Sequence, residues 1–188
     1  MKIILGSQSK NRRKVLSKMG YEFTTLSSDI DEKAIRDADP KKLVLLLANA
    51  KTDALLVRII KPTLLITSDQ VVIWNGQVRE KPESPEQAKE YLKSISQYPS
   101  QTVTSVVVTN TKTGKRLEGV DAAKIYFRPI PDEVIDKLVR NGTIFDYAGG
   151  FSTNDPLLFP YVDRIEGEVE SVLGLPKTLT QNLLEEAQ

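Results

Sequence analysis

The chain has 188 residues, 27% charged and 40% hydrophobic, with a formal net charge of +1 at pH 7; these ordinary values predict one folded domain over residues 1–188. No apolar run approaches the ~20 residues of a membrane span, and the first residues become charged too early for a signal peptide, so we expect a cytoplasmic protein without a membrane partner. With no histidine and no cysteine, the chain lacks a Ser-His-Asp triad, a thiolate nucleophile and the usual zinc ligands, and its balanced charge argues against a nucleic-acid partner.

The N-terminal segment predicts a strand, a tight loop and a helix. Residues 2–5 form a short apolar run, residues 6–9 are turn formers, and an apolar helical stripe then extends to about Gly20. Residues 22–26 are predicted to be extended. Asp39-Pro40 is typical of a helix cap followed by a first-turn proline. The long helix that it begins is predicted to have one apolar face, formed by Leu43, Leu46, Leu47, Ala50 and Ala54.

The middle of the chain predicts a hairpin and a second helix. Residues 64–74 are rich in β-branched side chains, and Asn75-Gly76 favours a two-residue hairpin turn, so residues 77–80 are the expected return strand. Ser84-Pro85-Glu86-Gln87 has the pattern of a capping box with proline at the first helical position. The helix that it opens is predicted to end at about Ser96.

The last third of the chain predicts both strands and helices. Residues 102–110 and 116–127 are extended runs on either side of a turn. A helix over residues 132–140 is predicted to stop at Asn141-Gly142, and a final helix to begin near Pro176. Because strands and helices alternate irregularly, the sequence predicts an α/β (α+β mixed) fold with a mixed sheet.

Residues 6–13, which form the loop before the first helix and the first turn of that helix, are a candidate anion site. A helix N-terminus presents unpaired N–H groups and a partial positive charge, and small residues before it let a phosphate approach the backbone. Lys10, Arg12, Arg13 and Lys14 place cations where the helix dipole disfavours them, and a bound anion would reverse the sign of that interaction. The alternative is that Ser9 only caps a helix with a solvated basic first turn.

Asp69 belongs to a polar segment, residues 67–70, between apolar strand residues. An unpaired carboxylate buried there would be costly, so Asp69 is expected to have a cation or a metal ion beside it, or to lie at a cleft. The alternative is an aspartate at a strand end or bulge, held by backbone N–H groups.

Several other residues are candidate site residues only when they are considered together with the loop before the first helix and with Asp69. Glu32 in an acidic stretch, Lys51 on the long helix and Lys81 after the hairpin are each, taken alone, more typical of solvated surface charges. The paired glycines Gly149 and Gly150 permit either the close approach of a ligand or a simple turn. Catalysis in this chain would depend on carboxylates, lysine, arginine, hydroxyls and a hard cation.

Seven short motifs, taken in order along nearly the whole chain, resemble the signature of the Maf family. They are Ser7-x-Ser9-x-x-Arg12-Arg13, Asp29-Ile30-Asp31-Glu32, Leu47-Ala48-x-x-Lys51, Ser68-Asp69-Gln70-Val71-Val72, Glu80-Lys81-Pro82, Ala148-Gly149-Gly150-Phe151 and Val172-Leu173-Gly174-Leu175-Pro176. The resemblance implies an elongated mixed sheet with flanking helices that form two lobes around a central cleft, and homodimers in many members. It also implies Mg²⁺- or Mn²⁺-dependent hydrolysis of a nucleoside triphosphate to the monophosphate and pyrophosphate.

The resemblance further implies which residues line the active site. Asp69 is expected to orient and deprotonate the attacking water, and Glu32 and Asp69 to hold the metal ion. The other expected catalytic residues are Lys51 and Lys81, which would neutralise charge on the bridging and leaving oxygens. The expected substrate-binding residues are Ser7, Ser9, Arg12 and Arg13.

Three positions are expected to select the base: Asn11, Gln70 and Asn154. The Ser-Asp-Gln form of the central motif resembles the branch that acts on 7-methyl-GTP, whereas the dTTP/UTP branch has a lysine in place of Tyr147. The 7-methyl-GTP branch, however, carries a tryptophan in place of Asn11 and a glutamate in place of Asn154. The chain therefore matches neither branch in full, and the base preference stays open.

Aromatic residues could stack on the base, and the candidates are Trp74, Tyr147 and Phe151.

The competing hypothesis is a nucleotide-binding regulator without catalytic activity, because Maf proteins have been linked by name to septum and division control. Release of pyrophosphate distinguishes the two, since a regulator would bind the nucleotide and leave it whole. The biological role, division control or cleaning of the nucleotide pool, stays open as well.

Overall fold

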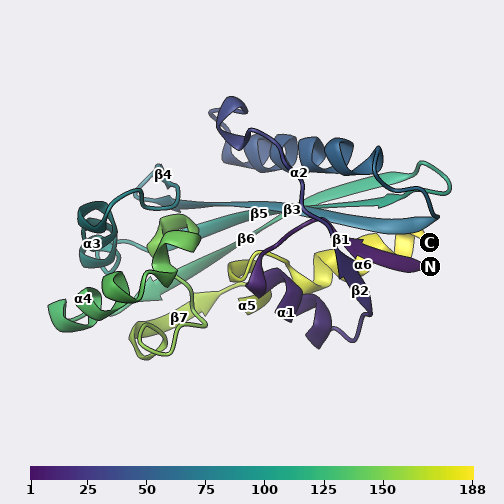
Figure 1. Ribbon diagram of the computed structural model, residues 1–188. Coiled ribbons are helices and arrows are strands. Elements are labelled where there is room, and N and C mark those ends of the chain that lie inside the picture. Colours follow the sequence, from purple (N-terminus) through teal and green to yellow (C-terminus); the bar gives the residue numbers. More distant parts are fainter. The chain divides into compact units, whose positions relative to one another are not determined.

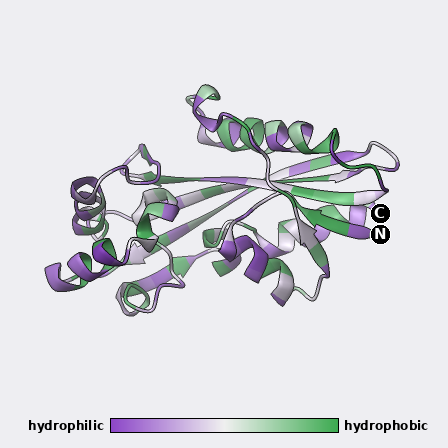
Figure 2. Cartoon of the chain, viewed as in Figure 1, coloured by the Kyte–Doolittle hydropathy of each residue, from purple (hydrophilic) through white to green (hydrophobic).

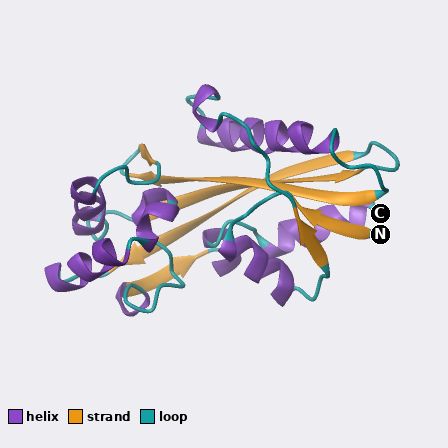
Figure 3. Ribbon diagram, viewed as in Figure 1, coloured by secondary structure: helices purple, strands orange, loops and turns teal.

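The computed structural model describes residues 1–188 and contains one seven-stranded sheet accompanied by helices (Figures 1 and 3). The strands are β1 (Lys2–Leu5), β2 (Phe23–Thr25), β3 (Thr63–Trp74), β4 (Gln77–Arg79), β5 (Ser100–Asn110), β6 (Arg116–Phe127) and β7 (Val162–Glu166). Their order is β2-β1-β3-β5-β6-β7, with β4 paired to β3 off this path. Strand β1 pairs in parallel with β2 and β3, whereas the pairs β3–β4 and β6–β7 are antiparallel. The predicted mixed sheet is therefore confirmed.

Every long helix that the sequence predicts is present. The helices are α1 (Lys10–Lys18), α2 (Pro40–Leu56), α3 (Pro85–Ser94), α4 (Asp132–Asn141), α5 (Val169–Val172) and α6 (Lys177–Ala187), with the short 3₁₀ helices η1 (Glu32–Ala34), η2 (Thr143–Asp146), η3 (Ala148–Gly150) and η4 (Phe159–Tyr161). The sequence did not predict β7, α5 or the 3₁₀ helices, because these short segments contain no run of aliphatic residues like the one in β1. None of the helices has the length and apolar character that crossing a membrane requires.

Local signals set the helix starts as predicted. The side chains of Ser9, Asp39 and Ser84 each accept a hydrogen bond from a backbone N–H in the first turn of α1, α2 and α3 respectively. In α3 the Gln87 carboxamide oxygen accepts in return from the N–H of Glu83, at 2.7 Å. The return bond therefore falls one residue before the position that a capping box usually uses.

The chain divides into two compact units. Unit 1 comprises Met1–Gln70, Thr104–Asp121 and Leu173–Gln188, and unit 2 comprises Val71–Val103 and Ala122–Val172. Strands β3, β5 and β6 each contribute residues to both units, and each unit has its own apolar core. The single domain over residues 1–188 and the cleft between two lobes stay predictions.

In unit 1, helix α2 lies on one face of the strands, and α1 and α6 lie on the other (Figure 1). Helix α1 is mostly hydrophilic (Figure 2) and buries only Val15 and Leu16. The predicted apolar face of α2 is wrong in part, because Leu46 is 47% exposed. The buried face includes Lys51 and Thr52. Because these two residues are polar, a search for apolar positions does not place them on the buried face.

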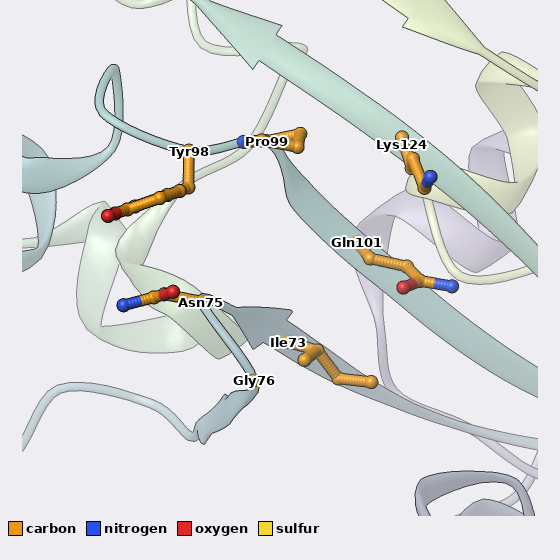
Figure 4. A pocket seen from close by; sticks show the side chains of 7 residues that line it. All are labelled: Ile73, Asn75, Gly76, Tyr98, Pro99, Gln101 and Lys124. Atoms are coloured by element: carbon orange, nitrogen blue, oxygen red, sulfur yellow. The ribbon is translucent and has the colours of Figure 1, made fainter.

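In unit 2, helices α3 and α4 pack against each other. The predicted hairpin turn is present, with positive φ values of 47° at Asn75 and 74° at Gly76, as a type I′ turn requires. A hollow of about 190 Å³ lies beside this turn (Figure 4). It is lined by Ile73, Asn75, Gly76, Tyr98, Pro99, Gln101 and Lys124. None of these is a predicted site residue.

Candidate active site

The polar segment that contains Asp69 lies in the middle of the twelve-residue strand β3. Asp69 is therefore not a strand-end residue, and that part of the alternative interpretation is wrong. Successive side chains of a strand point to opposite faces of the sheet. Thr67 and Asp69 accordingly bond to residues of α2, whereas the Ser68 hydroxyl donates to the carbonyl of Gly174 at 2.9 Å.

Asp69, Lys51 and Glu32 form a charged cluster on the α2 side of the strand. The Lys51 ammonium donates a hydrogen bond to the Asp69 carboxylate, and its Nζ lies 2.9 Å from Oε1 of Glu32. The side chains of Lys51 and Asp69 are 8% and 9% exposed, whereas that of Glu32 is 57% exposed. The cluster thus extends from the buried strand to the protein surface.

The surroundings of Asp69 change its acidity. Burial raises the pKa of the Asp69 carboxyl above its ordinary value, and the positive charges of Lys51 and Arg12 oppose this rise. Burial also lowers the pKa of the Arg12 guanidinium, against the effect of Asp69 and Glu32. A carboxylate with a raised pKa is a better proton acceptor near neutral pH than a solvated one.

Arg12 is held by groups from three separate segments of unit 1. Its Nε donates to the carbonyl of Gly174 at 2.8 Å, and its Nη1 donates to the carbonyl of Ser68 at 2.9 Å and to the hydroxyl of Ser7 at 3.3 Å. The same hydroxyl accepts from the N–H of Ser9 at 3.2 Å. The loop that precedes α1 is therefore joined to β3 and to the segment before α6 through one guanidinium.

Hydrogen bonds of buried hydroxyl groups attach α2 to strands β3 and β5. The hydroxyls of Thr52 and Thr67 lie 2.6 Å apart and both contact the carbonyl of Ala48, while the Ser105 hydroxyl donates to the carbonyl of Val44 at 2.6 Å. The three hydroxyl-bearing residues are fully buried. Because Thr52 follows Lys51 and Thr67 precedes Asp69 by two residues, these bonds also fix the spacing of the Lys51–Asp69 pair.

Not every predicted residue joins this cluster. The side chain of Arg13 is exposed on α1 and forms no ion pair with the carboxylates of Asp69 or Glu32. Lys81 and Asn154 are exposed residues of unit 2. Their convergence with the residues of unit 1 stays a prediction.

The predicted specificity residues lie in different surroundings. Asn11 is half-buried on α1, and the Gln70 carboxamide nitrogen donates to the hydroxyl of Thr104 at 2.7 Å. Thr104 was not predicted as a site residue, because nothing distinguishes it from the other β-branched residues of its strand. Its contact with Gln70 arises only from the pairing of β3 with β5.

The aromatic residues proposed for base stacking are partly engaged elsewhere. Phe151 is 5% exposed and packs edge-on against Phe127 in the core of unit 2, so its proposed stacking role is wrong. Phe151 belongs to the apolar core cluster of unit 2 and directly follows the turn at Gly149 and Gly150, whose φ values are 70° and 71°. One face of Trp74 is covered by the guanidinium of Arg79, 3.7 Å from the ring centroid.

The donor set around Asp69 fits a hard divalent cation. The carboxylates of Asp69 and Glu32 both face one positive group, the ammonium of Lys51, although no cluster of three or more potential metal-ligating side chains is present. Magnesium is commonly bound through one or two carboxylates, with substrate phosphates and water as the remaining ligands. The carboxylates of Asp69 and Glu32, which both contact the Lys51 ammonium, are consistent with magnesium bound through two carboxylates.

Gly6 lets the loop before α1 lie directly against β3 and α2. Its N–H donates to the carbonyl of Ile66 at 2.7 Å, and an added Cβ would lie 2.6 Å from Cδ1 of Leu55 and 2.8 Å from Cγ2 of Thr67. We expect Gly6→Ala to lower the free energy of unfolding by about 1–3 kcal/mol, because overpacked groups have no room to move. Urea denaturation measures the change.

Gly119→Ala is the comparison for this experiment. The atoms nearest to a Cβ at Gly119 would all belong to the side chain of Leu179, which is half-buried and can rotate away. We therefore expect a smaller loss of stability than in Gly6→Ala. Equal losses in the two variants would contradict the close approach at Gly6.

Comparisons with known proteins show which family this chain resembles. The family model described as Maf-like protein matches residues 2–187. The chain is 51% identical over 189 residues to the 7-methyl-GTP pyrophosphatase of Dictyostelium discoideum, covering 97% of this chain and 95% of that protein. It is 32% identical over 175 residues to the 7-methyl-GTP pyrophosphatase of Vibrio vulnificus, covering 93% and 89% of the two chains. It is 31% identical over 185 residues to the dTTP/UTP pyrophosphatase of the same bacterium, covering 98% of each. The chain belongs to the Maf family.

Proposed function

We propose that this protein is a nucleoside triphosphate pyrophosphatase, a hydrolase that splits a nucleotide into the nucleoside monophosphate and pyrophosphate. The observation that carries the proposal is the buried pair of Asp69 and Lys51, with the charge of Arg12 close enough to affect Asp69. A proton acceptor beside fixed cations is what hydrolysis of a polyphosphate needs. The full-length similarity to named pyrophosphatases supports the same reaction.

In this mechanism Asp69 orients a water molecule and accepts a proton from it as the water oxygen attacks the α-phosphorus of the nucleotide. The α–β anhydride bond breaks, and pyrophosphate leaves with the bridging oxygen. Lys51 and Lys81 neutralise the negative charge that grows on the bridging and leaving oxygens. The raised pKa of Asp69 favours its role as the base, since burial makes the carboxyl hold a proton more readily.

The phosphates are held at the start of α1. Arg12 supplies the fixed positive charge, Ser7 and Ser9 line the loop, and the partial positive charge at the N-terminus of α1 adds to the attraction. Arg13, which is exposed on the same turn, extends the positive charge toward solvent.

Asp69 and Glu32 are the residues proposed to hold Mg²⁺ or Mn²⁺. When bound, such an ion neutralises phosphate charge and lowers the pKa of coordinated water. Removal of divalent cations with EDTA should therefore abolish activity, and addition of Mg²⁺ or Mn²⁺ should restore it.

We propose a 7-methylguanine nucleotide as the preferred substrate. Identity to the 7-methyl-GTP pyrophosphatase of Dictyostelium discoideum is 51%, against 31% to a dTTP/UTP pyrophosphatase. Asn11, Gln70 and Asn154 are the proposed base-selecting residues. A homodimer and a cytoplasmic location are further proposals that follow from family membership and composition.

A panel of nucleotides tests the proposed function. With Mg²⁺ or Mn²⁺, we expect the purified protein to release pyrophosphate from 7-methyl-GTP at least about 10-fold faster than from GTP, since recognition of one methyl group is worth roughly 10- to 200-fold. UTP and dTTP serve as the competing substrates, and chromatography identifies the products. Binding without any release of pyrophosphate would favour the non-catalytic regulator, and release of orthophosphate would contradict the reaction assigned.

A further inference from the structure

One backbone carbonyl in unit 1 accepts hydrogen bonds from two residues that are distant in sequence. The carbonyl oxygen of Gly174 accepts from Nε of Arg12 at 2.8 Å and from the hydroxyl of Ser68 at 2.9 Å. Gly174 precedes α6, Arg12 lies on α1 and Ser68 lies on β3. The segment around Gly174, residues 172–176, has no role in the mechanism proposed above.

The hydrogen bonds that Arg12 donates within the protein leave one edge of its guanidinium for a ligand. An arginine side chain has five N–H hydrogens. Those on Nε and Nη1 are directed to the carbonyl of Gly174, the carbonyl of Ser68 and the hydroxyl of Ser7. None of these three bonds uses Nη2, so its two hydrogens form the edge that can donate to an anion.

The backbone of Gly174 suits glycine alone. Its φ is +87°, and a Cβ there would lie 3.1 Å from Nε and 3.5 Å from Nη2 of Arg12. Any side chain would therefore be strained in its backbone and would also press on the guanidinium. A larger residue at this position would displace the group that the carbonyl holds.

We propose that Gly174 and Ser68 are positioning residues, which hold the Arg12 guanidinium so that its Nη2 edge faces the substrate phosphates. This inference rests on the proposed function. Bonds at both Nε and Nη1 remove the freedom of the last side-chain torsions before the substrate arrives. The anion then binds without the entropic cost of ordering a long side chain.

A pair of glycine variants separates positioning from backbone strain. Gly20 has a φ of +84°, close to that of Gly174, and no atom lies within 4 Å of an added Cβ. Gly174→Ala and Gly20→Ala therefore introduce similar backbone strain, but only the first displaces Arg12. Inorganic pyrophosphate is the probe, because its binding can be measured by titration calorimetry without turnover.

We expect Gly174→Ala to weaken pyrophosphate binding by about tenfold, the effect of losing one well-placed hydrogen bond to a charged group. Gly20→Ala is expected to stay within about twofold of the wild type, as for a change that touches no other residue. Equal affinities in the two variants, or a wild-type protein that does not bind pyrophosphate, would overturn the positioning role. Failure of the wild type to release pyrophosphate from any nucleotide would instead overturn the proposed function.

A spectroscopic measurement on the wild-type protein tests the same role without any risk of misfolding. In protein labelled with ¹⁵N-arginine, the Nε–H signal of Arg12, assigned with Arg12→Lys, should exchange with water more slowly than that of exposed Arg13. The protection should disappear in Gly174→Ala and persist in Gly20→Ala. Exchange of Arg12 as fast as that of Arg13 in the wild type would contradict the proposal.

Discussion

Asp69→Asn is expected to reduce turnover by about 10²- to 10⁴-fold, the usual contribution of a general base. Asparagine keeps the size of the side chain but cannot accept a proton from water. Nucleotide binding should change little, because Arg12 and the loop before α1 keep their own hydrogen bonds. Pyrophosphate release measures turnover, and calorimetry with a nucleotide in the absence of turnover measures binding.

Asp53→Asn is the matched control. Asp53 also belongs to unit 1 and pairs with a cation, Arg116, at 2.6 Å, but its side chain is 65% exposed. The control variant should keep activity within about twofold of the wild type. If Asp69→Asn retained as much as about a tenth of the activity, Asp69 would not be the base, since the loss would be smaller than general-base catalysis supplies.

Lys51→Met is expected to be both inactive and unstable. Its ammonium is the hydrogen-bonding partner of the buried Asp69 carboxylate, and methionine has a similar length without the charge. Removing one partner of a buried ion pair typically costs about 3–5 kcal/mol, because the other charge stays buried without compensation. Urea denaturation at neutral pH measures this loss. Lys42→Met, an exposed change on the same helix, should leave stability almost unaltered.

The instability of Lys51→Met should depend on pH. Burial raises the pKa of Asp69, and Lys51 is the strongest of the groups that oppose it, so its removal raises that pKa further. The native variant then holds a proton on Asp69 at pH values where the unfolded chain, with a carboxyl pKa of about 3.9, has lost it. Stability is therefore greatest below the unfolded pKa and falls as the pH rises toward the folded pKa.

The double variant Lys51→Met/Asp69→Asn provides the decisive comparison. Because it contains no buried unpaired charge at this position, it should recover much of the stability that Lys51→Met loses, while remaining inactive. Such recovery measures the coupling of the two residues directly. If the double variant were as unstable as Lys51→Met at neutral pH, the loss would come from packing of the lysine stem and not from its charge.

The elements of this fold were predictable where the signal lies within a few residues. The caps at Ser9, Asp39 and Ser84 and the turn at Asn75-Gly76 depend on local hydrogen bonds and backbone angles. Strand β7 was missed because five residues without alternation give no pattern. The face of α2 was misplaced because its buried side includes polar residues that bond to the strands.

The residues of the charged cluster were named from the sequence, but their contacts were not predictable. The motifs named Asp69, Lys51, Glu32 and Arg12, and their resemblance to one family was correct. Nothing in the sequence indicated that the Gly174 carbonyl would hold Arg12, or that Thr104 would bond to Gln70. Phe151, which was proposed for base stacking, is instead a core residue.

By itself the sequence determined the helix starts, the hairpin turn, the mixed α/β class and the family of this protein. The tertiary structure alone decided which charges meet, because strand pairing and burial bring together residues as far apart as Arg12 and Gly174. Local preferences act between neighbours along the chain. The partner of a buried charge depends on whatever the folded core places beside it, and that placement is a property of the whole chain.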